Sequence, residues 1–346
     1  MSASEQAFEP PLRYLPRADV VTAGGNIDAV RIVRDVLELH AIGQTTLPAE
    51  AYLGWTTSSG SFARSLALPG ALWGRESAIG LKVINSSISN PDRGIPRAQG
   101  ITLLFDRETA RPVALMEAAH ISALRTAAYT ALSIDLLAAR SADIAVIGCG
   151  ALGEQHVRLL AERQPFSTFL LHDIDQKRCD DLVSQLLAAG ISVKSVATAQ
   201  SAVQQANVVI TTTTVTAGYI EAGWLRAGTL IAHVSLDDVL PEVVEQADLL
   251  IVDDWGLVSN DNHRLLGKMY RAGRISGPGA GGAVPISGRR VDATLADIAT
   301  GRHPGRGDDR QIILSNPFGM GILDIAIAAE IWKAARSANL GMELPV

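Results

Sequence analysis

A glycine-rich turn in the middle of the chain has the residue types and spacing that bind a dinucleotide. Residues 148–153 read GCGALG, a G-x-G-x-x-G sequence that follows the apolar run IAVI and precedes a helical pattern. In such a turn Gly148 permits the tight bend, Gly150 lets the backbone approach a pyrophosphate, and Gly153 lets the helix pack closely on the strand. Asp173 stands 20 residues after Gly153, at the end of the next apolar run. The pattern predicts a dinucleotide site; the alternative is a glycine turn without a ligand.

The residues around this turn also indicate which dinucleotide would bind. A helix that begins at Ala151 and Leu152 would direct free N–H groups and its positive dipole end at the phosphates. Asp173 would accept hydrogen bonds from the adenosine ribose hydroxyls, and its charge would repel a 2′-phosphate. We therefore expect NAD rather than NADP, although Lys177 and Arg178 lie close enough in sequence to weaken the preference.

Further polar side chains follow later strands of the same region. Thr212 and Thr213 end an apolar run, so their hydroxyls are candidates for the cofactor cleft, or they are β-branched residues that fill a strand. Asp237 and Asp238 come directly after the run LIAHVS. A carboxylate at that edge can act as an acid or base toward an amine or a water, or it can cap the following segment.

Three basic residues in the first part of the chain are candidates for holding a substrate carboxylate. Lys82 is the only lysine among the first 176 residues and lies in an apolar strand-like run, where a lysine is costly unless it is paired or used. The alternative is a strand-edge lysine that reaches solvent. Arg125 has the planar fork that grips carboxylates, or it forms a structural ion pair with Glu117. Arg64 is a weaker candidate.

Composition excludes several other classes of protein. The chain has 346 residues, 47% of them hydrophobic, and a net charge of −6, which does not favour nucleic-acid binding. Two cysteines cannot build a disulfide framework, and the seven histidines show no metal-ligand spacing, so we expect no metal. The first residues lack a secretory pattern and no apolar stretch is long enough to span a membrane, so we expect a cytoplasmic protein.

The order of apolar patterns predicts two domains of different type. A helix over residues 27–41, then the runs SFARSLALP, AIGLKVINS, GITLLFD and PVALMEA, indicate an α+β domain with an antiparallel sheet. A helix follows over residues 121–139. From residue 140 onward, buried strands alternate with helices, which is typical of a Rossmann-type doubly wound parallel sheet. A last, mostly apolar helix is expected over residues 321–337.

With these residues described, the sequence resembles the ornithine cyclodeaminase/μ-crystallin family. The resemblance rests on GLKVINSS, LMEAAHISALRTAA, AVIGCGALGEQH and ILSNPFGMGILDIA, which occur in order along nearly the whole chain. It implies a substrate-binding and dimerisation domain of residues 1–139 and 315–346, and an NAD domain of residues 140–314. It also implies a homodimer. From the net charge and the apolar pattern given above we expect neither a nucleic-acid nor a membrane partner.

The resemblance assigns roles to individual residues. Lys82 and Arg125 would bind the substrate carboxylate, and Asn316 would lie near the nicotinamide ribose. The family has an acid/base aspartate in a G-x-D-x-x-G-K-T-E-like segment, which here reads VSLDDVLPEVV. We favour Asp238 over Asp237 for that role.

Several segments, among them NPDRGIPRAQG and GRGDDRQIILSNPFGMG, are most similar to one branch of the family. That branch implies NAD-dependent oxidative cleavage of N-(2-amino-2-carboxyethyl)-L-glutamate to L-2,3-diaminopropionate, 2-oxoglutarate and NADH. The diaminopropionate would serve siderophore or antibiotic biosynthesis. The alternatives within the family are an ornithine or lysine cyclodeaminase that recycles its NAD, and a non-catalytic, μ-crystallin-like NAD-binding protein.

Overall fold

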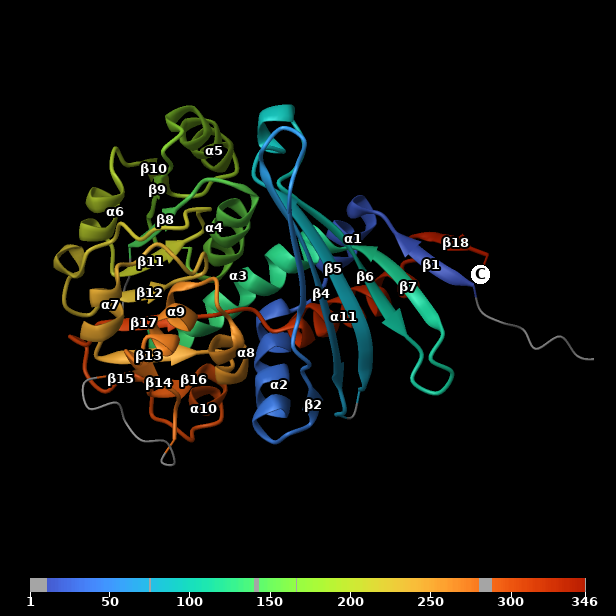
Figure 1. Ribbon diagram of the computed structural model, residues 1–346. Coiled ribbons are helices and arrows are strands. Elements are labelled where there is room, and N and C mark those ends of the chain that lie inside the picture. The colour runs from blue at the N-terminus through green and yellow to red at the C-terminus, as the bar shows by residue number, and fades with distance from the viewer. Residues whose placement is uncertain (1–10, 75, 140–142, 166, 280–287, 346) are drawn as a thin grey trace, which may run out of the picture. The chain divides into compact units, whose positions relative to one another are not determined.

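A computed structural model describes residues 11–74, 76–139, 143–165, 167–279 and 288–345. The described residues form two compact units (Figure 1). The first unit is drawn from Met1–Asp28, Gly43–Ser122 and Gly321–Val346, and the second from Ala29–Ile42 and Ala123–Met320. The N-terminal residues in which we saw no secretory pattern lie, up to residue 10, outside the described part.

The first unit is built on an eight-stranded, mostly antiparallel sheet. Its strand order is β18-β1-β7-β6-β5-β4-β2, with β3 paired to β4 and β1 parallel to β7. The expected antiparallel strands correspond to β4 through β7; the short strands β1 and β18, from the two ends of the chain, were not expected. The elements are β1 (Leu12–Leu15), α1 (Arg17–Gly24), β2 (Thr45–Thr46), β3 (Ala51–Thr56), β4 (Phe62–Leu72), β5 (Ala78–Ser87), the 3-10 turn η1 (Pro91–Arg93), β6 (Ala98–Phe105), β7 (Pro112–Glu117), α11 (Gly321–Ser337) and β18 (Met342–Leu344).

Helix α11 covers one face of this sheet, against β4, β5 and β6. Gly70 and Gly80 form a cross-strand pair on that face. A Cβ atom at Gly70 would lie 2.8 Å from the side chain of Ile322, and one at Gly80 would lie 3.4 Å from the side chain of Ile325. The two glycines therefore let an apolar helix approach the sheet closely.

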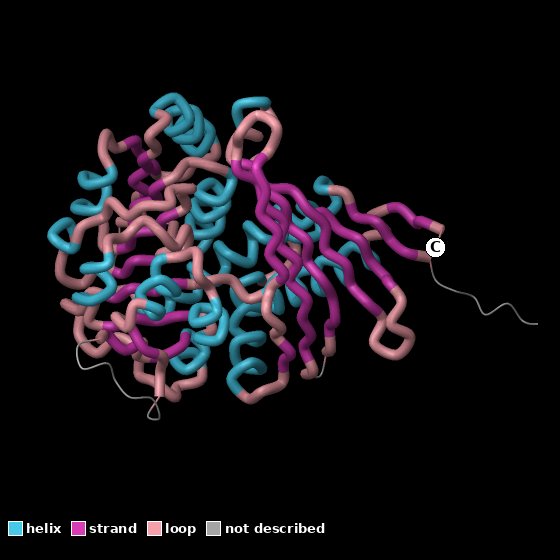
Figure 2. The backbone as a smooth tube through the Cα atoms, in the orientation of Figure 1, coloured by secondary structure: helices cyan, strands magenta, loops and turns pink. Residues whose placement is uncertain are grey.

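The second unit contains an eight-stranded parallel sheet of order β10-β9-β8-β11-β12-β17-β13-β16. Figure 2 shows its strands in magenta, with helices in cyan around them. Its chain order reverses direction between β8 and β11, which is the switch point of a doubly wound fold. The fold class predicted from the sequence is confirmed. The sheet strands are β8 (Ile144–Ile147), β9 (Phe169–His172), β10 (Val193–Ser195), β11 (Val208–Thr211), β12 (Leu230–Ala232), β13 (Leu249–Val252), β16 (Ala293–Thr294) and β17 (Ile313–Asn316).

Helices and short elements surround this sheet. They are α2 (Ala29–Ala41), α3 (Ala118–Leu137, whose first five residues belong to the first unit), α4 (Ala151–Arg163), α5 (Gln176–Ala188), α6 (Ala199–Gln205), η2 (Ala222–Trp224), α7 (Pro241–Gln246), α8 (Trp255–Asn260), α9 (Leu265–Arg271), β14 (Ile275–Ser276), β15 (Arg289–Arg290) and α10 (Leu295–Ala299).

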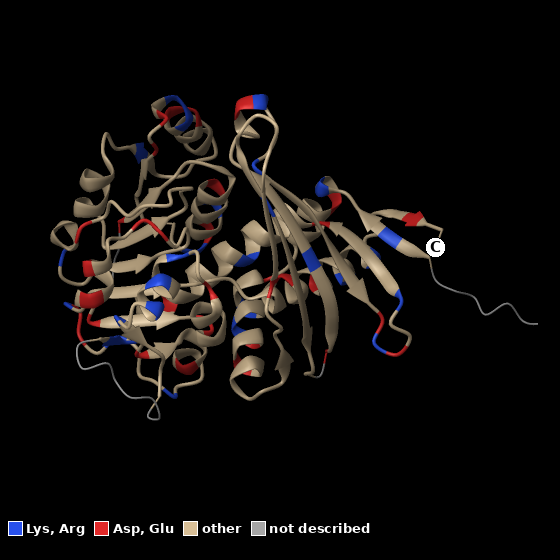
Figure 3. Cartoon of the chain, in the orientation of Figure 1, with Lys and Arg blue, Asp and Glu red and all other residues tan. Residues whose placement is uncertain are grey.

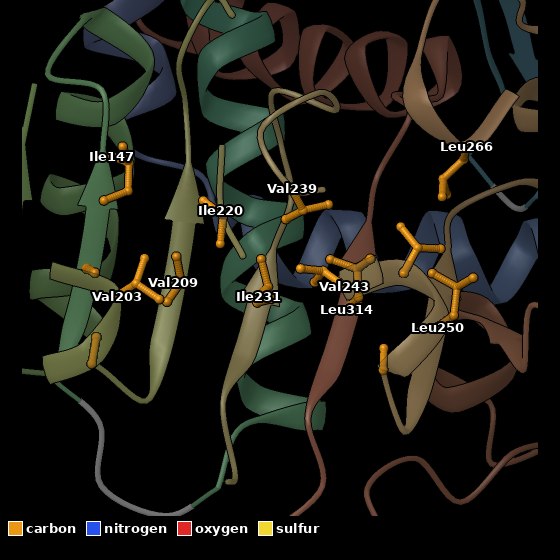
Figure 4. Packing of buried hydrophobic residues seen from close by; sticks show 14 of the residues in the cluster. Ile147, Val203, Val209, Ile220, Ile231, Val239, Val243, Leu250, Leu266 and Leu314 are labelled. Carbon is orange, nitrogen blue, oxygen red and sulfur yellow. The ribbon is translucent and has the colours of Figure 1, made fainter. Parts of the chain in front are cut away.

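Apolar strand residues make the core of the second unit. Ile147, Val209, Ile231, Leu250 and Leu314 come from five neighbouring strands and are buried together (Figure 4). The strands themselves carry few charged residues, which lie mainly on helices and loops (Figure 3). A parallel sheet covered on both faces requires this continuous apolar pattern.

The compact units differ from the domain limits expected from the sequence. Helix α2 and most of α3, expected in the first domain, cluster with the parallel sheet. Packing explains the difference, since α2 contacts α10 and Thr130 of α3 lies within hydrogen-bond distance of His156 of α4 (Oγ1 to Nε2, 3.0 Å). The expected limit at residues 139–140 borders residues 140–142, which lie outside the described part, and the functional division stays a prediction.

Candidate active site

The glycine turn after β8 has the geometry that its sequence predicts. Gly148 has a φ of +104°, which other residues rarely adopt, and a Cβ atom there would lie 2.8 Å from the backbone of Thr212. A Cβ atom at Gly153 would collide with the carbonyl oxygen of Gly148. Gly150 is different, because among the described residues no atom beyond its chain neighbours lies within 4 Å of the position of its missing Cβ. Close packing thus requires glycine at positions 148 and 153, whereas Gly150 leaves open space beside the backbone.

The start of helix α4 adds donors to that space. The N–H of Glu154 donates to the carbonyl oxygen of Gly150 (3.0 Å) and begins the helical ladder. The N–H groups of Ala151, Leu152 and Gly153 precede it and lie outside the ladder. Open space at Gly150 and these donors fit a pyrophosphate, so the residues present are suited to a dinucleotide.

Asp173 connects the end of β9 to the glycine turn. Its Oδ2 accepts a hydrogen bond from the N–H of Cys149 (2.8 Å), and its Oδ1 accepts one from the N–H of Asp175 (2.9 Å). Arg178 lies between carboxylates, 3.6 Å from Asp173 and 3.3 Å from Asp175, and Lys177 pairs with Asp181 (2.6 Å). The two basic residues that weakened the predicted NAD preference are therefore both engaged by acidic neighbours.

A cavity of about 330 Å³ lies beside this turn. It is lined by Cys149, Glu154, Asp175, Lys177, Arg178, Asp181, Leu182 and Gln185. Burial raises the pKa of the Cys149 thiol, which agrees with a packed residue and not with a nucleophile.

The hydroxyls of the predicted threonines donate to the protein itself. Thr212 Oγ1 donates to the carbonyl oxygen of Gly148 (2.8 Å) and so fixes the glycine turn. Thr213 Oγ1 donates to Asp238 Oδ1 (2.6 Å). Their direct contact with a cofactor stays a prediction.

Asp238 is a fully buried carboxylate held by hydroxyl groups. Oδ1 accepts from Thr213 and from the hydroxyl of Tyr219 (3.1 Å), and Oδ2 accepts a short hydrogen bond from Ser235. Burial raises the pKa of the Tyr219 phenol, and the charge of Asp238 adds to that effect, so Tyr219 remains a donor. Three O–H donors hold the Asp238 carboxylate in place.

The neighbouring aspartate has a different partner. Asp237 pairs with Arg264 (2.9 Å) and accepts a hydrogen bond from the N–H of Leu265 at the start of α9 (3.0 Å). The residue before it, Leu236, has a φ of +75°. The left-handed backbone at Leu236 lies in the tight turn that places the two carboxylates among different partners.

His233 and Asn316 lie at the carboxyl ends of the adjacent strands β12 and β17. Asn316 Oδ1 is 2.8 Å from His233 Nδ1, and the N–H of Asp238 donates to His233 Nε2 (2.9 Å). Burial lowers the pKa of His233. The imidazole is therefore neutral, and it links Asn316 to the backbone of Asp238.

Arg125 lies against the loop that follows Asn316. Its guanidinium nitrogens would be 3.2 Å from a Cβ atom at Gly319, whose φ is +116°. The N–H of Gly319 donates to Asp253 Oδ2 (2.6 Å), and burial raises the pKa of Asp253. Glu117, the alternative partner of Arg125, instead accepts from the N–H groups at the start of α3 and pairs with Arg17 (3.6 Å).

In the first unit, Lys82 is buried and paired. Its side chain is 2% exposed, and its Nζ lies 2.9 Å from Oδ2 of Asp324, a fully buried residue of α11. Ser122 Oγ lies 3.4 Å from the same Nζ. The alternative of a solvent-reaching lysine is wrong, and Lys82 already has a carboxylate partner within the protein.

Arg64 lies on the same face of the sheet as Lys82 but not beside it. In the backbone register, Lys82 of β5 lies opposite Leu68 of β4, and Arg64 lies on β4 four residues before Leu68. That offset is about 13 Å along a strand. The backbones of Arg64 and Lys82 are thus well separated along the strand, and a role of Arg64 in substrate binding stays a prediction.

Several residues of these clusters were not expected from the sequence, among them Asp324, His233 and Tyr219. Asp324 could have been found from the same signal as Lys82, since it is a charge in an apolar run, ILDIAIA. His233 lies between apolar residues at a strand end and gives a weaker signal. Tyr219 has no sequence signal, because its position depends on how a loop folds.

Other classes of site find no support in the described residues. No group of three His, Cys, Asp or Glu side chains in that part of the chain is arranged to hold a metal ion. Among the helices of the described residues, none has the length and apolar character to cross a membrane.

The parallel sheet, its glycine turn and Asp173 define a dinucleotide-binding class of protein. The chain belongs to the ornithine cyclodeaminase/mu-crystallin family, whose sequence profile matches residues 26–339. It is 33% identical to N-((2S)-2-amino-2-carboxyethyl)-L-glutamate dehydrogenase of Staphylococcus aureus strain NCTC 8325, over 96% of this chain and 97% of that protein.

Two solved structures are similar over nearly the whole chain. The crystal structure of CmnK has 40% sequence identity and a TM-score of 0.89, covering 98% of this chain and 99% of that one. An archaeal alanine dehydrogenase dimer with bound NAD has 25% identity and a TM-score of 0.80, covering 96% of this chain and 98% of that one.

Proposed function

We propose that the protein is an NAD-dependent oxidoreductase that cleaves N-(2-amino-2-carboxyethyl)-L-glutamate to L-2,3-diaminopropionate and 2-oxoglutarate. The choice of substrate is supported by the similarity to the Staphylococcus aureus dehydrogenase, which extends over 96% of this chain and 97% of that protein. The cofactor is supported by the open space at Gly150 and the N–H groups that follow it. When bound, NAD would supply the two-electron oxidant, and hydride would leave the glutamate Cα that is attached to the bridging nitrogen. That nitrogen would lose its proton, water would add to the carbon of the resulting C=N bond, and the bond between this carbon and the nitrogen would break. The products would be 2-oxoglutarate, L-2,3-diaminopropionate, NADH and a proton.

The protein residues would bind and orient the reactants. Asp173 would hold the adenosine ribose, and Asn316 the nicotinamide half of NAD. Lys82 and Arg125 would bind carboxylates of the substrate, which are abundant in this compound. Asp238 would accept or return a proton by way of the Ser235 and Tyr219 hydroxyls that contact it.

The first unit supports a homodimer. Opposite the face covered by α11, cross-strand neighbours Leu81, Leu103 and Leu115 form a partly exposed apolar row beside Val83 and Ile101. An apolar sheet face of this kind is normally covered, and we propose a second copy of the chain as its cover. Light scattering should show a dimer, and Leu103→Glu should shift it toward monomer.

Cytoplasmic location stays a prediction, as does the use of the product in siderophore or antibiotic biosynthesis.

The direct test mixes the purified protein, NAD and the proposed substrate. We expect growth of the reduced-nicotinamide absorbance band and equal amounts of 2-oxoglutarate and L-2,3-diaminopropionate by mass spectrometry. Conversion of ornithine or lysine without net NADH would overturn the proposal in favour of a cyclodeaminase. Tight NAD binding without turnover of these compounds would indicate a non-catalytic binding protein.

The cofactor assignment has a separate test. Gly150→Ala adds a methyl group that, among the described residues, meets no atom within 4 Å other than those of its chain neighbours. The fold should therefore tolerate it, while NAD affinity falls at least 10-fold. Gly223→Ala is the matched control, because its added methyl group also meets no atom within 4 Å but lies in η2. Fluorescence titration of NADH measures both. Unchanged affinity in Gly150→Ala would contradict pyrophosphate binding at this turn.

A further inference from the structure

We infer that His233 is a positioning residue that holds the side-chain amide of Asn316 with its Nδ2 hydrogens, and not its oxygen, facing the nicotinamide half of bound NAD. The inference rests on the proposed NAD-dependent function. It concerns one unit only, because both residues belong to the parallel sheet.

The two residues lie where a nicotinamide would be expected. Asn316 ends β17, and His233 follows β12, its hydrogen-bonded neighbour, in which Ala232 pairs with Ser315. Ligands of doubly wound sheets bind at the carboxyl ends of the strands. Strand β17 is three strands from β8 and its glycine turn, which is about 14 Å at the usual strand spacing.

The hydrogen bonds of His233 determine its tautomer. The backbone N–H of Asp238 donates to Nε2 at 2.9 Å, and that of Val239 lies at 3.4 Å. A backbone N–H is always a donor, so Nε2 carries no hydrogen. Because the buried ring is neutral, its one hydrogen must be on Nδ1. The carboxylate of Asp238, 3.8 Å from Nε2, therefore faces an unprotonated nitrogen and forms no ion pair with it.

The tautomer in turn determines the orientation of Asn316. Nδ1–H requires an acceptor, and the atom 2.8 Å away must be the amide oxygen of Asn316 and not its nitrogen. The Nδ2 group is turned away from His233, and within the described residues it donates to no protein acceptor. Asn316 is 2% exposed, and its Nδ2 is not one of the fully buried side-chain atoms that lack a partner, so this group is open to an acceptor from solvent or from a ligand. The ribose hydroxyls and carboxamide oxygen of a nicotinamide riboside are acceptors of the required kind.

Two amide substitutions of His233 separate this role from a structural one. His233→Asn places an amide near the former Nδ1, so it can still donate to Asn316. His233→Gln places an amide near the former Nε2, so it can still accept from the Asp238 N–H but no longer fixes Asn316. NADH and ADP-ribose, which lacks the nicotinamide, are titrated against wild type and both variants, with thermal unfolding as a control.

We expect His233→Gln to weaken NADH binding about 2- to 10-fold, as for loss of one hydrogen bond, and to leave ADP-ribose binding unchanged. His233→Asn should retain NADH binding. The inference is overturned if His233→Gln binds NADH as wild type does, or if NADH and ADP-ribose weaken together.

Asn316→Asp gives the test if neither His233 variant folds. Its carboxylate still accepts from Nδ1–H but has no hydrogen to donate, so NADH should again weaken while ADP-ribose does not. Equal NADH affinity would overturn the inference. Wild-type protein that binds neither ligand would instead refute the proposed function, so the two failures are distinguishable.

Discussion

The two units stabilise buried charge in different ways. In the first unit, the ammonium of Lys82 faces the carboxylate of Asp324, and both side chains are almost completely buried. In the second unit, the buried carboxylate of Asp238 accepts hydrogen bonds from the hydroxyls of Thr213, Tyr219 and Ser235. One charge is balanced by an opposite charge, and the other by several neutral dipoles.

The difference determines how each cluster responds to change. Removing one member of a buried ion pair leaves a full charge without compensation. Removing one of the three hydroxyl donors still leaves the Asp238 carboxylate with two hydrogen bonds. The ion pair is thus the more sensitive arrangement, and a substrate carboxylate at Lys82 would have to share the ammonium with Asp324.

The largest expected effect is the loss of the Lys82 partner. Asp324→Ala should lower the free energy of unfolding by about 3–5 kcal/mol, because a buried ammonium loses its counter-charge. Denaturant titration measures it. The matched control is Lys82→Met with Asp324→Leu, which removes both charges and should come within about 1 kcal/mol of wild type or exceed it. A cost below about 1 kcal/mol for Asp324→Ala would show that the pair is not buried in solution.

The same pair separates stability from substrate binding. Lys82→Ala alone should destabilise the fold, because it leaves the carboxylate of Asp324 buried without its counter-charge. If Lys82 had no partner in the protein, the same substitution would leave stability nearly unchanged. Lys82→Ala combined with Asp324→Ala should recover stability but lose activity. Its kcat/KM should fall about 10- to 150-fold, equivalent to about 1.5–3 kcal/mol for a charge-assisted hydrogen bond. Steady-state kinetics with unchanged NADH affinity would support the role, and wild-type kcat/KM would refute it.

The sequence predicted the second unit more completely than the first. The roles of Gly148, Gly150 and Gly153 depend on neighbours within a single strand–turn–helix unit, so spacing alone predicts their geometry. The parallel strands were also predictable, since burial on both faces makes each strand apolar throughout.

Long-range pairing explains what could not be predicted. The apolar run around Lys82 indicated a buried lysine in need of a partner, but Asp324 lies near the other end of the chain. The different partners of Asp237 and Asp238 depend on the left-handed turn at Leu236, which the spacing of residues does not reveal. The tautomer of His233 depends on backbone N–H groups that no residue type reveals.

The hydroxyl cluster should respond less strongly than the ion pair. Tyr219→Phe removes one of three donors to Asp238 and should lower the free energy of unfolding by about 1.5 kcal/mol. Denaturant titration measures this, with Tyr270→Phe, a more exposed tyrosine of α9 in the same unit, as the control. A loss as large as that of Asp324→Ala would contradict the distinction between the two clusters.

The smallest effect concerns a partly exposed pair in the second unit. His40 Nε2 lies 3.3 Å from Asp254 Oδ2, and the hydrogen bond from His40 is the main reason why the pKa of Asp254 is lowered. A carboxylate with a lowered pKa in the folded state stabilises the fold above its unfolded pKa of about 3.9 and loses that contribution as the pH falls through the folded value.

Asp254→Asn is the matched variant, because Asn keeps an oxygen that can cap α8 through the N–H of Leu257. At pH 7 wild type should be more stable by about 0.5–1 kcal/mol, as for a pair near the surface. Urea titrations at about pH 5 and about pH 3 should show a smaller advantage at the lower pH. An advantage that grows between about pH 5 and about pH 3 would mean that the Asp254 carboxylate is less stable in the fold than in the unfolded chain, opposite to the lowered pKa that its hydrogen bond with His40 produces.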